Sequence, residues 1–201
     1  MDKKTYELIK KKHGGYASWA IWAIPEVWEG AGSRANMNDV SFFEDDQILT
    51  KLNPNIVLVG LNFSVSGVVQ NPFQNFHGQG GGAFKIRYAL KNTAFWGAYM
   101  TDIIKDFPEK ESHNVMKYLR NNSDFIDQNI ISFEEELKDI KANDPTIVGF
   151  GNDSYDILQT NLGSKYNIIK AMHYSHYISK ENYREHMMGV LNDWNNNKHK
   201  T

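Results

Sequence analysis

The stretch Ile56-Val57-Leu58-Val59-Gly60-Leu61 decides the fold class of this sequence. It is a continuous run of apolar and largely β-branched residues, which is typical of a strand buried on both faces of a parallel sheet. The turn Asn53-Pro54-Asn55 leads into it, and loop residues follow from Asn62. Such a strand favours an α/β domain, in which helices cover both faces of the sheet.

Three further stretches predict strands, and they alternate with predicted helices. The strands are expected at residues 98–104, 146–150 and 167–172. Helices are expected near residues 5–12, 45–52, 85–95, 112–121, 132–141, 151–162 and 179–194. This alternation predicts an α/β fold, a three-layer α/β/α sandwich with a four-stranded, mostly parallel central sheet.

The chain shows no linker or internal repeat, so we expect one domain over residues 1–201. Residues 1–45 are interpreted as an N-terminal helical extension, in which the i, i+3 spacing of Trp19 and Trp22 fits one helical face. Residues 195–201 are interpreted as a polar tail.

The composition excludes several classes of protein. With 201 residues, of which 41% are hydrophobic, the chain is long enough for one sizeable core. Its apolar runs are far shorter than the ~20 residues of a spanning helix, and its polar start lacks a signal core, so we expect a cytoplasmic protein without a membrane partner. The absence of cysteine excludes disulfides, thiolate zinc sites and iron–sulfur clusters. The net charge of −2 is not the basic charge typical of nucleic-acid binders, although a local basic groove is compatible with it.

The ends of the predicted strands mark where a site is expected. Ligands of parallel α/β sheets bind outside the carboxyl ends of the strands. This rule indicates Asn62, Asp102, Gly151 and His173 before any family is considered.

Four segments in this order resemble motifs of the uracil-DNA glycosylase superfamily. The stretch from Asn55 to Ser64 resembles the first motif, a strand that ends in Gly-x-Asn-Pro or Gly-x-Asp-Pro. The stretches 98–105 and 145–151 resemble two strands of the iron–sulfur members, and His173-Tyr174-Ser175 resembles the second motif, His-Pro-Ser. Order and spacing agree over roughly residues 50–194.

The sequence departs from the family pattern at several positions. Phe63 and Tyr174 stand where the two motifs carry proline, and Asp102 stands where the family strand usually carries an asparagine that reads the uracil edge. The chain also lacks the cysteines of the cluster-bearing subgroup. It therefore resembles a divergent member without the iron–sulfur cysteines, for which we predict neither a cofactor nor a metal.

The resemblance implies a DNA glycosylase that hydrolyses the N-glycosidic bond of uracil or another deaminated or altered base, with DNA as partner and the base extruded from the stack. It implies that Asn62 positions water and that His173 stabilises the departing base, with Phe73 or Phe76 stacking on that base. Ser175 is implied to contact DNA phosphate. The implied catalytic residues are Asn62 and His173, and the implied substrate-binding residues are Gly60, Leu61, Phe63, Phe73, Phe76, Asp102 and Ser175.

Each of these residues also has a purely structural interpretation. Asn62 and Ser175 can cap local turns, and Phe73 and Phe76 can anchor their loop to the core. His173 can be satisfied by backbone, or it can bind a metal together with one of the neighbouring histidines His176 and His186.

Asp102 leaves three alternatives open. An ionised aspartate only accepts hydrogen bonds, so it suits an amino group beside a ring N–H better than it suits uracil. A buried, protonated aspartate regains a donor. A structural aspartate paired with Lys105 or Arg87 is the third alternative.

Two other functions also remain open. One is a noncatalytic nucleic-acid or protein-binding domain of the same fold, and the other is an enzyme that acts on a small nucleoside or nucleobase. A basic groove near Asn62 and His173 favours DNA, whereas a closed acidic pocket favours a small molecule.

Overall fold

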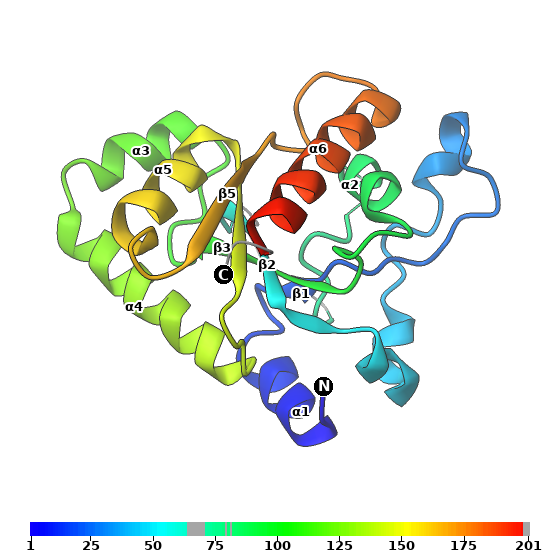
Figure 1. Ribbon diagram of the computed structural model, residues 1–201, viewed down its shortest axis with the longest axis horizontal. Helices are drawn as coiled ribbons and strands as arrows, with labels where there is room; N and C mark the ends of the chain where they lie inside the picture. Colours follow the sequence, from blue (N-terminus) through cyan, green and yellow to red (C-terminus); the bar gives the residue numbers. More distant parts are fainter. Residues whose placement is uncertain (64–70, 79, 81, 199–201) are drawn as a thin grey trace.

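The computed structural model describes residues 1–63, 71–78, 80 and 82–198, and in them it has a five-stranded sheet of order β1-β3-β2-β4-β5 (Figure 1). Strands β2 to β5 run parallel, and β1 is antiparallel to β3. The α/β class is confirmed, but the sheet is mixed and has one strand more than predicted. The strands are β1 (Ser18–Trp19), β2 (Asn53–Asn62), β3 (Ala98–Ile104), β4 (Thr146–Phe150) and β5 (Asn167–Ala171).

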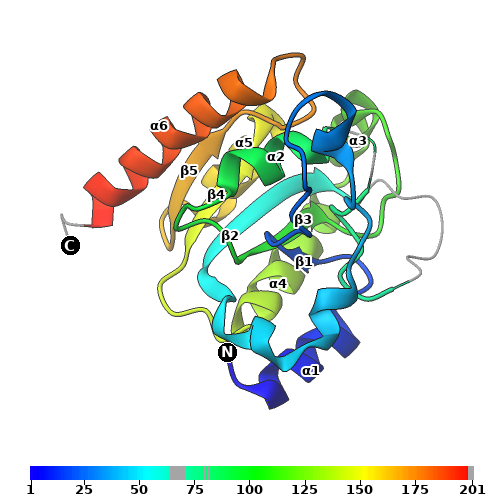
Figure 2. The ribbon, with the colours of Figure 1, turned by 90° about the vertical axis from the view of Figure 1, so that its right-hand side faces the viewer.

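Helices lie on both sides of the sheet. Helices α2 and α6 lie on one side, and α3, α4 and α5 lie on the other (Figures 1 and 2). The helices are α1 (Lys3–Lys12), α2 (Ala83–Leu90), α3 (Ser112–Leu119), α4 (Ser123–Asp139), α5 (Gly151–Leu162) and α6 (Lys180–Lys198). Three 3₁₀ helices precede β2, namely η1 (Gly30–Arg34), η2 (Ser41–Glu44) and η3 (Asp46–Thr50).

The continuous apolar run of β2 serves both faces, because successive side chains of a strand point in opposite directions. Val57 and Val59 belong to the core cluster that includes residues of α1, α4 and α5. Ile56 and Leu58 belong to the cluster that includes residues of α2 and α6. Burying one such side chain stabilises the fold by about 1.5–3 kcal/mol, which explains why every position from 56 to 59 is apolar.

The expected helix through Trp19 and Trp22 is wrong. Trp19 belongs to β1 and packs edge-on against Tyr99, with ring centroids 4.9 Å apart. The segment pairs with the edge of β3, where the amide of Ala20 donates to the carbonyl of Ala98 at 2.7 Å. The non-local pairing with β3 outweighs the local helical spacing of the two tryptophans. Residues 1–45 therefore contribute an edge strand to the sheet and are not only a helical extension of the domain.

Several other boundaries differ from those predicted. Helix α2 ends at Leu90 and not near residue 95, and the helix expected near residues 45–52 is the 3₁₀ helix η3. Helix α4 begins at Ser123 and not near residue 132, and α6 continues to Lys198 into the expected polar tail. Residues 199–201 of that tail lie outside the described part of the chain. The helices of the described part are all too short or too polar to cross a lipid bilayer.

Candidate functional site

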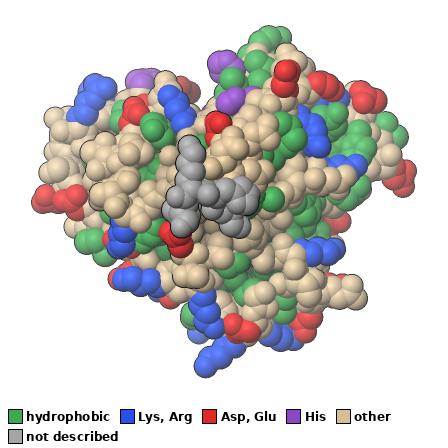
Figure 3. Space-filling model, viewed as in Figure 1, with side chains coloured by type: hydrophobic (Ala, Val, Ile, Leu, Met, Phe, Trp, Pro, Cys, Tyr) green, Lys and Arg blue, Asp and Glu red, His purple; other side chains and the backbone are tan. Residues whose placement is uncertain are grey.

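A cavity of about 670 Å³ opens at the carboxyl ends of the parallel strands. Asn62, Asp102 and His173 all line it, so the strand-end rule brought the intended side chains together. In Figure 3 histidine side chains lie along the upper edge of the molecule, the side to which these strand ends point in Figure 1. The other lining residues are Leu61, Asn75, Phe76, Lys110, Glu111, Ser112, Phe150, Gly151, Asn152, Asp153, Ser154, Tyr174 and Ser175.

Gly60 makes room for Asp102, which lies directly opposite it in the β2–β3 register. A Cβ on Gly60 would overlap the Oδ1 atom of Asp102, so only glycine leaves space for this carboxyl group. Gly60 is not among the residues that line the cavity, whereas its neighbour Leu61 is. The structure thus gives Gly60 a supporting role beside Asp102, and its contact with a substrate stays a prediction.

Asp102 is a buried acid with a raised pKa. Its side chain is only 6% exposed, and burial raises the pKa to about 7, against the opposing effects of the Asn75 amide and the positive charge of Lys105. The Nδ2 atom of Asn75 lies 3.3 Å from Oδ2 of Asp102. At neutral pH both the protonated and the ionised form of the carboxyl group are therefore accessible.

The ion pair suggested for Asp102 does not form. The Nζ atom of Lys105 lies 2.8 Å from Oε2 of the fully buried Glu136 and donates to the backbone carbonyl of Asp102 at 2.9 Å. Arg87 is bound instead to the carbonyls of Ala23, Ser33 and Ala35. The carboxyl group of Asp102 thus faces the cavity without a salt-bridge partner among the described residues.

The amide nitrogen of Asn62 makes structural hydrogen bonds, whereas its amide oxygen does not take part in them. Its Nδ2 atom donates to the carbonyls of Phe107 at 3.1 Å and Glu109 at 2.6 Å. These two bonds use both amide hydrogens and fix the amide orientation, since a carbonyl oxygen only accepts. The side chain therefore holds the segment after β3. Asn62 also lines the cavity, and its Oδ1 atom has no hydrogen-bond partner among the described residues.

His173 is held as a neutral imidazole of defined tautomer. The backbone N–H of Ser175 donates to Nδ1 of His173 at 3.2 Å, and the Ser175 hydroxyl lies 2.7 Å from the same atom. A backbone N–H only donates, so Nδ1 accepts and Nε2 carries the hydrogen. Burial lowers the pKa of His173 to about 4, and the positive charge of Lys85 adds to this effect. At neutral pH His173 is an uncharged donor.

His186 cannot share a metal ion with His173 through its Nε2 atom. The Nε2 atom of His186 accepts a hydrogen bond from the backbone N–H of Met172 at 2.8 Å, which occupies its lone pair. The described residues contain no group of three or more histidine or acidic side chains placed to hold a metal ion.

The two candidate stacking residues, Phe73 and Phe76, lie in different surroundings. Phe76 lines the cavity, whereas Phe73 is fully buried and packs against Tyr6 and Phe43 at centroid distances of 5.5 and 5.2 Å. The proposed stacking of Phe73 is therefore corrected to anchoring of the loop. Phe63 is also absent from the cavity, and its backbone N–H continues the β2–β3 ladder to Ile104 at 2.9 Å.

Sequence reasoning missed Asn75 and Tyr174 as site residues. Asn75 donates to the Tyr16 carbonyl as well as to Asp102, and its place between two singled-out phenylalanines was the available signal. The ring of Tyr174 stacks on His173 at 4.4 Å and meets Phe150 edge-on at 5.6 Å. Burial, with a contribution from the charge of Asp102, raises the pKa of Tyr174. The residue that replaces the motif proline thus supports the imidazole.

The rim of the cavity is not a basic groove. Its charged residues are Lys110, Glu111 and Asp153, and Asp102 lies deeper. The first residues of α3 and α5 also line the cavity, and helix N-termini carry partial positive charge. The acidic side chains are therefore offset only in part.

Comparisons of the chain with protein-family models, with curated proteins and with solved structures found no match. The resemblance to the glycosylase superfamily therefore rests on the four sequence motifs alone.

Proposed function

We propose that this protein is a glycosylase-like hydrolase that cleaves the N-glycosidic bond of uracil or another deaminated or altered base in DNA. The observation that carries the proposal is the convergence of Asn62, Asp102 and His173 on one cavity with Phe76 in its lining. These are the positions at which the resemblance implies water placement, base recognition, leaving-group stabilisation and stacking.

His173 suits the departing base. Cleavage leaves negative charge on a carbonyl oxygen of the base and positive character on the sugar. A fixed, uncharged Nε2–H donor stabilises that oxygen as its charge develops, and needs no proton from solvent beforehand. The stacked ring of Tyr174 and the two bonds from Ser175 keep the donor oriented.

Asn62 suits the attacking water. The Oδ1 acceptor can orient a water hydrogen, but an amide is too weak a base to remove the proton early. We therefore expect slow turnover, in which the positive sugar is formed before water adds.

Asp102 suits the edge of the base. In the protonated form its hydroxyl donates to a carbonyl oxygen while its other oxygen accepts from the adjacent ring N–H, which is the pattern of uracil. The ionised form accepts twice and favours a ring N–H beside an amino group. Phe76 supplies the face on which the base stacks.

A free nucleoside is the second candidate substrate, and the rim charges favour it. Glu111 and Asp153 would repel the phosphates of a duplex, whereas Lys110 is the one lysine or arginine among the described residues that line the cavity. The same hydrolysis of the glycosidic bond would then act on a free nucleoside, which has no phosphate backbone.

One assay separates these candidates. Base release is measured from single-stranded and duplex oligonucleotides that contain uracil, hypoxanthine, xanthine or mismatched thymine, and from the corresponding free nucleosides, with His173→Ala as the inactive control. We expect release from at least one oligonucleotide. Release from nucleosides alone would establish the second candidate, and no release from any substrate would reject the proposed hydrolase.

A further inference from the structure

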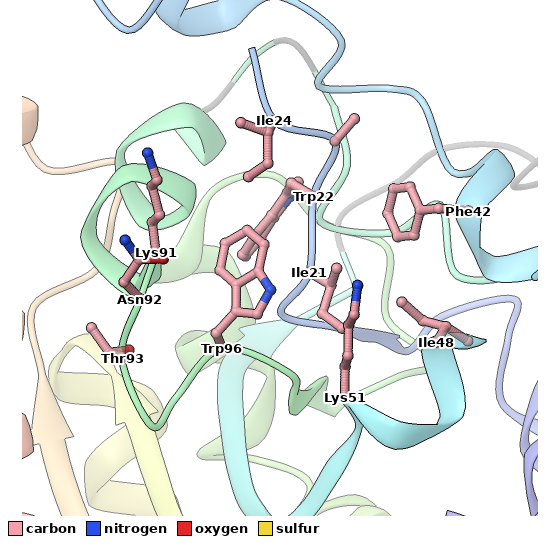
Figure 4. A pocket seen from close by; sticks show the side chains of 11 residues that line it. Ile21, Trp22, Ile24, Phe42, Ile48, Lys51, Lys91, Asn92, Thr93 and Trp96 are labelled. Atoms are coloured by element: carbon pink, nitrogen blue, oxygen red, sulfur yellow. The ribbon is translucent and has the colours of Figure 1, made fainter. Parts of the chain in front are cut away.

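A second cavity, of about 560 Å³, lies at the amino ends of β2 and β3 (Figure 4). Lys51 and Trp96 each lie two residues before one of these strands, so the cavity is on the opposite edge of the sheet from Asn62. We call it the Trp96 groove. Its apolar lining is Ile21, Trp22, Ile24, Phe42, Ile48 and Trp96, and Lys51, Lys91, Asn92 and Thr93 complete it with Ala23.

Aromatic and aliphatic side chains form the body of the groove. Figure 4 shows the indole of Trp96 at its centre, with Trp22 behind it at a centroid distance of 5.8 Å. Ile24 lies at the edge and is 53% exposed, although it is a large apolar side chain. A ligand that covered Trp96 and Ile24 would remove this surface from water, which is favourable at roughly 25 cal/mol per Å².

Two lysines give the groove its charge. Lys51 and Lys91 lie on opposite sides of Trp96 (Figure 4), and the described residues that line the groove include no aspartate or glutamate. Neither lysine forms an ion pair with any residue that the structure describes, whereas Lys3, Lys10 and Lys12 of α1 each do. The ammonium group of Lys91 lies 4.3 Å from the centre of the Trp28 ring, a contact that leaves its charge uncompensated.

We propose that the Trp96 groove binds an aromatic anion, a planar ring system that carries a carboxylate, sulfonate or phosphate group. The ring would stack on Trp96 within the apolar lining, and the anionic group would meet Lys51 or Lys91. The volume lies within the range of about 300–1,000 Å³ of small-molecule sites. Apolar walls with two lysines that form no ion pair with the described residues fit this chemistry better than an uncharged hydrophobe, which would leave the positive charges of Lys51 and Lys91 unbalanced.

The first test uses 1-anilinonaphthalene-8-sulfonate as the anionic probe and N-phenyl-1-naphthylamine as its uncharged counterpart. Lys51→Gln and Lys91→Gln should each weaken binding of the sulfonate about two- to fivefold at low salt, as expected for one exposed charge contact. Binding of the uncharged compound should stay unchanged. Lys117→Gln, on the exposed surface of α3, is the charge-matched control and should affect neither compound.

The second test locates the probe. The five tryptophans give separate indole N–H signals in a ¹⁵N-correlation spectrum, and those of Trp22 and Trp96 should shift while that of the buried Trp19 stays in place. Trp96→Leu should weaken both compounds, because it removes the stacking surface. The proposal is overturned if the sulfonate does not bind, if Lys117→Gln weakens it as much as Lys51→Gln and Lys91→Gln do, or if the shifts leave out Trp22 and Trp96. None of these outcomes depends on the hydrolase activity.

Discussion

The two cavities of this protein lie at opposite edges of one sheet and are built in different ways. The carboxyl-end cavity gathers Asn62, Asp102 and His173 from three strand ends, and burial shifts the pKa values of the last two in opposite directions. The Trp96 groove is built from irregular segments, with apolar walls and lysines that line it. A parallel sheet thus concentrates titratable chemistry at one edge and leaves the other to loops.

The largest expected effect concerns stability, and it should belong to the carboxyl-end cavity alone. Asp102 holds its proton more tightly in the folded chain than the ordinary value of 3.8 allows, with a pKa of about 7. Its stabilising contribution is therefore present below pH 4 and is lost as the pH rises through 7. At about 1.4 kcal/mol per pH unit, the free energy of unfolding of the wild type should fall by about 4 kcal/mol relative to Asp102→Asn between pH 4 and pH 8.

Urea unfolding of both proteins at each pH measures this difference. Trp96→Leu, in the groove, is the control, and its offset from the wild type should not vary with pH. A constant offset for Asp102→Asn as well would mean that Asp102 is not desolvated, and the contrast between the two cavities would disappear.

The next effect concerns catalysis. His173→Ala and Asn62→Ala should each slow base release by about a hundredfold or more, since each removes a positioned polar group from the transition state. Lys51→Gln and Lys91→Gln should leave the rate within about twofold of the wild type. Thermal melts accompany the rates, because Asn62→Ala also removes the donor of two carbonyls. Full activity in His173→Ala would remove the histidine from the mechanism.

A smaller effect concerns the pH dependence of the same reaction. Uracil needs the protonated form of Asp102, so kcat/KM for uracil should be level below pH 7 and fall about tenfold per pH unit well above it. Asp102→Asn supplies the donor and acceptor at every pH, so its profile should stay level there. A wild-type profile that rises above pH 7 would instead favour a base with two donors on its edge.

The smallest effect concerns a hydrogen bond that joins a residue of one cavity to a residue of the other. The loop residue Phe76 adopts a φ of +69°, and its carbonyl accepts from the indole of Trp22 in the groove at 3.3 Å. Among variants that lack the ring, Phe76→Gly should be more stable than Phe76→Ala by about 1 kcal/mol, because glycine adopts this backbone without strain. Chemical denaturation of the two variants measures the difference. Equal stabilities would mean that the backbone relaxes when the ring is removed.

The sequence predicted the four parallel strands well because their signal is local. The apolar run of β2 and the polar residues at or near the carboxyl ends of β2, β3 and β5 can be read from neighbouring positions, and the strand-end rule then assembled the cavity. Strand β1 was missed because two residues carry no periodicity, and its structure comes from pairing with β3. Helix α4 was predicted too short, although apolar residues at 126, 130, 133 and 137 continue the helical spacing.

The site was predictable in its residues but not in their partners. Nothing near Lys105 in the sequence indicates that it pairs with Glu136, which lies 31 positions later on α4, instead of Asp102. The burial of Phe73 depends on Tyr6 and Phe43, whose positions follow only from the packing of the first 45 residues. The Trp96 groove left no signal at all, because its lining comes from several short segments without regular spacing.

The two bonds donated by Asn62 have a consequence for substitution at this position. Aspartate would be the stronger base at this position, yet a carboxylate there would set an oxygen against the carbonyls of Phe107 and Glu109, which it cannot bind. A single Asn62→Asp replacement would therefore loosen the segment before α3 at the same step in which it improved the chemistry. In the proposed hydrolase, the stronger base at this position would therefore require a change in that segment as well as the substitution at Asn62.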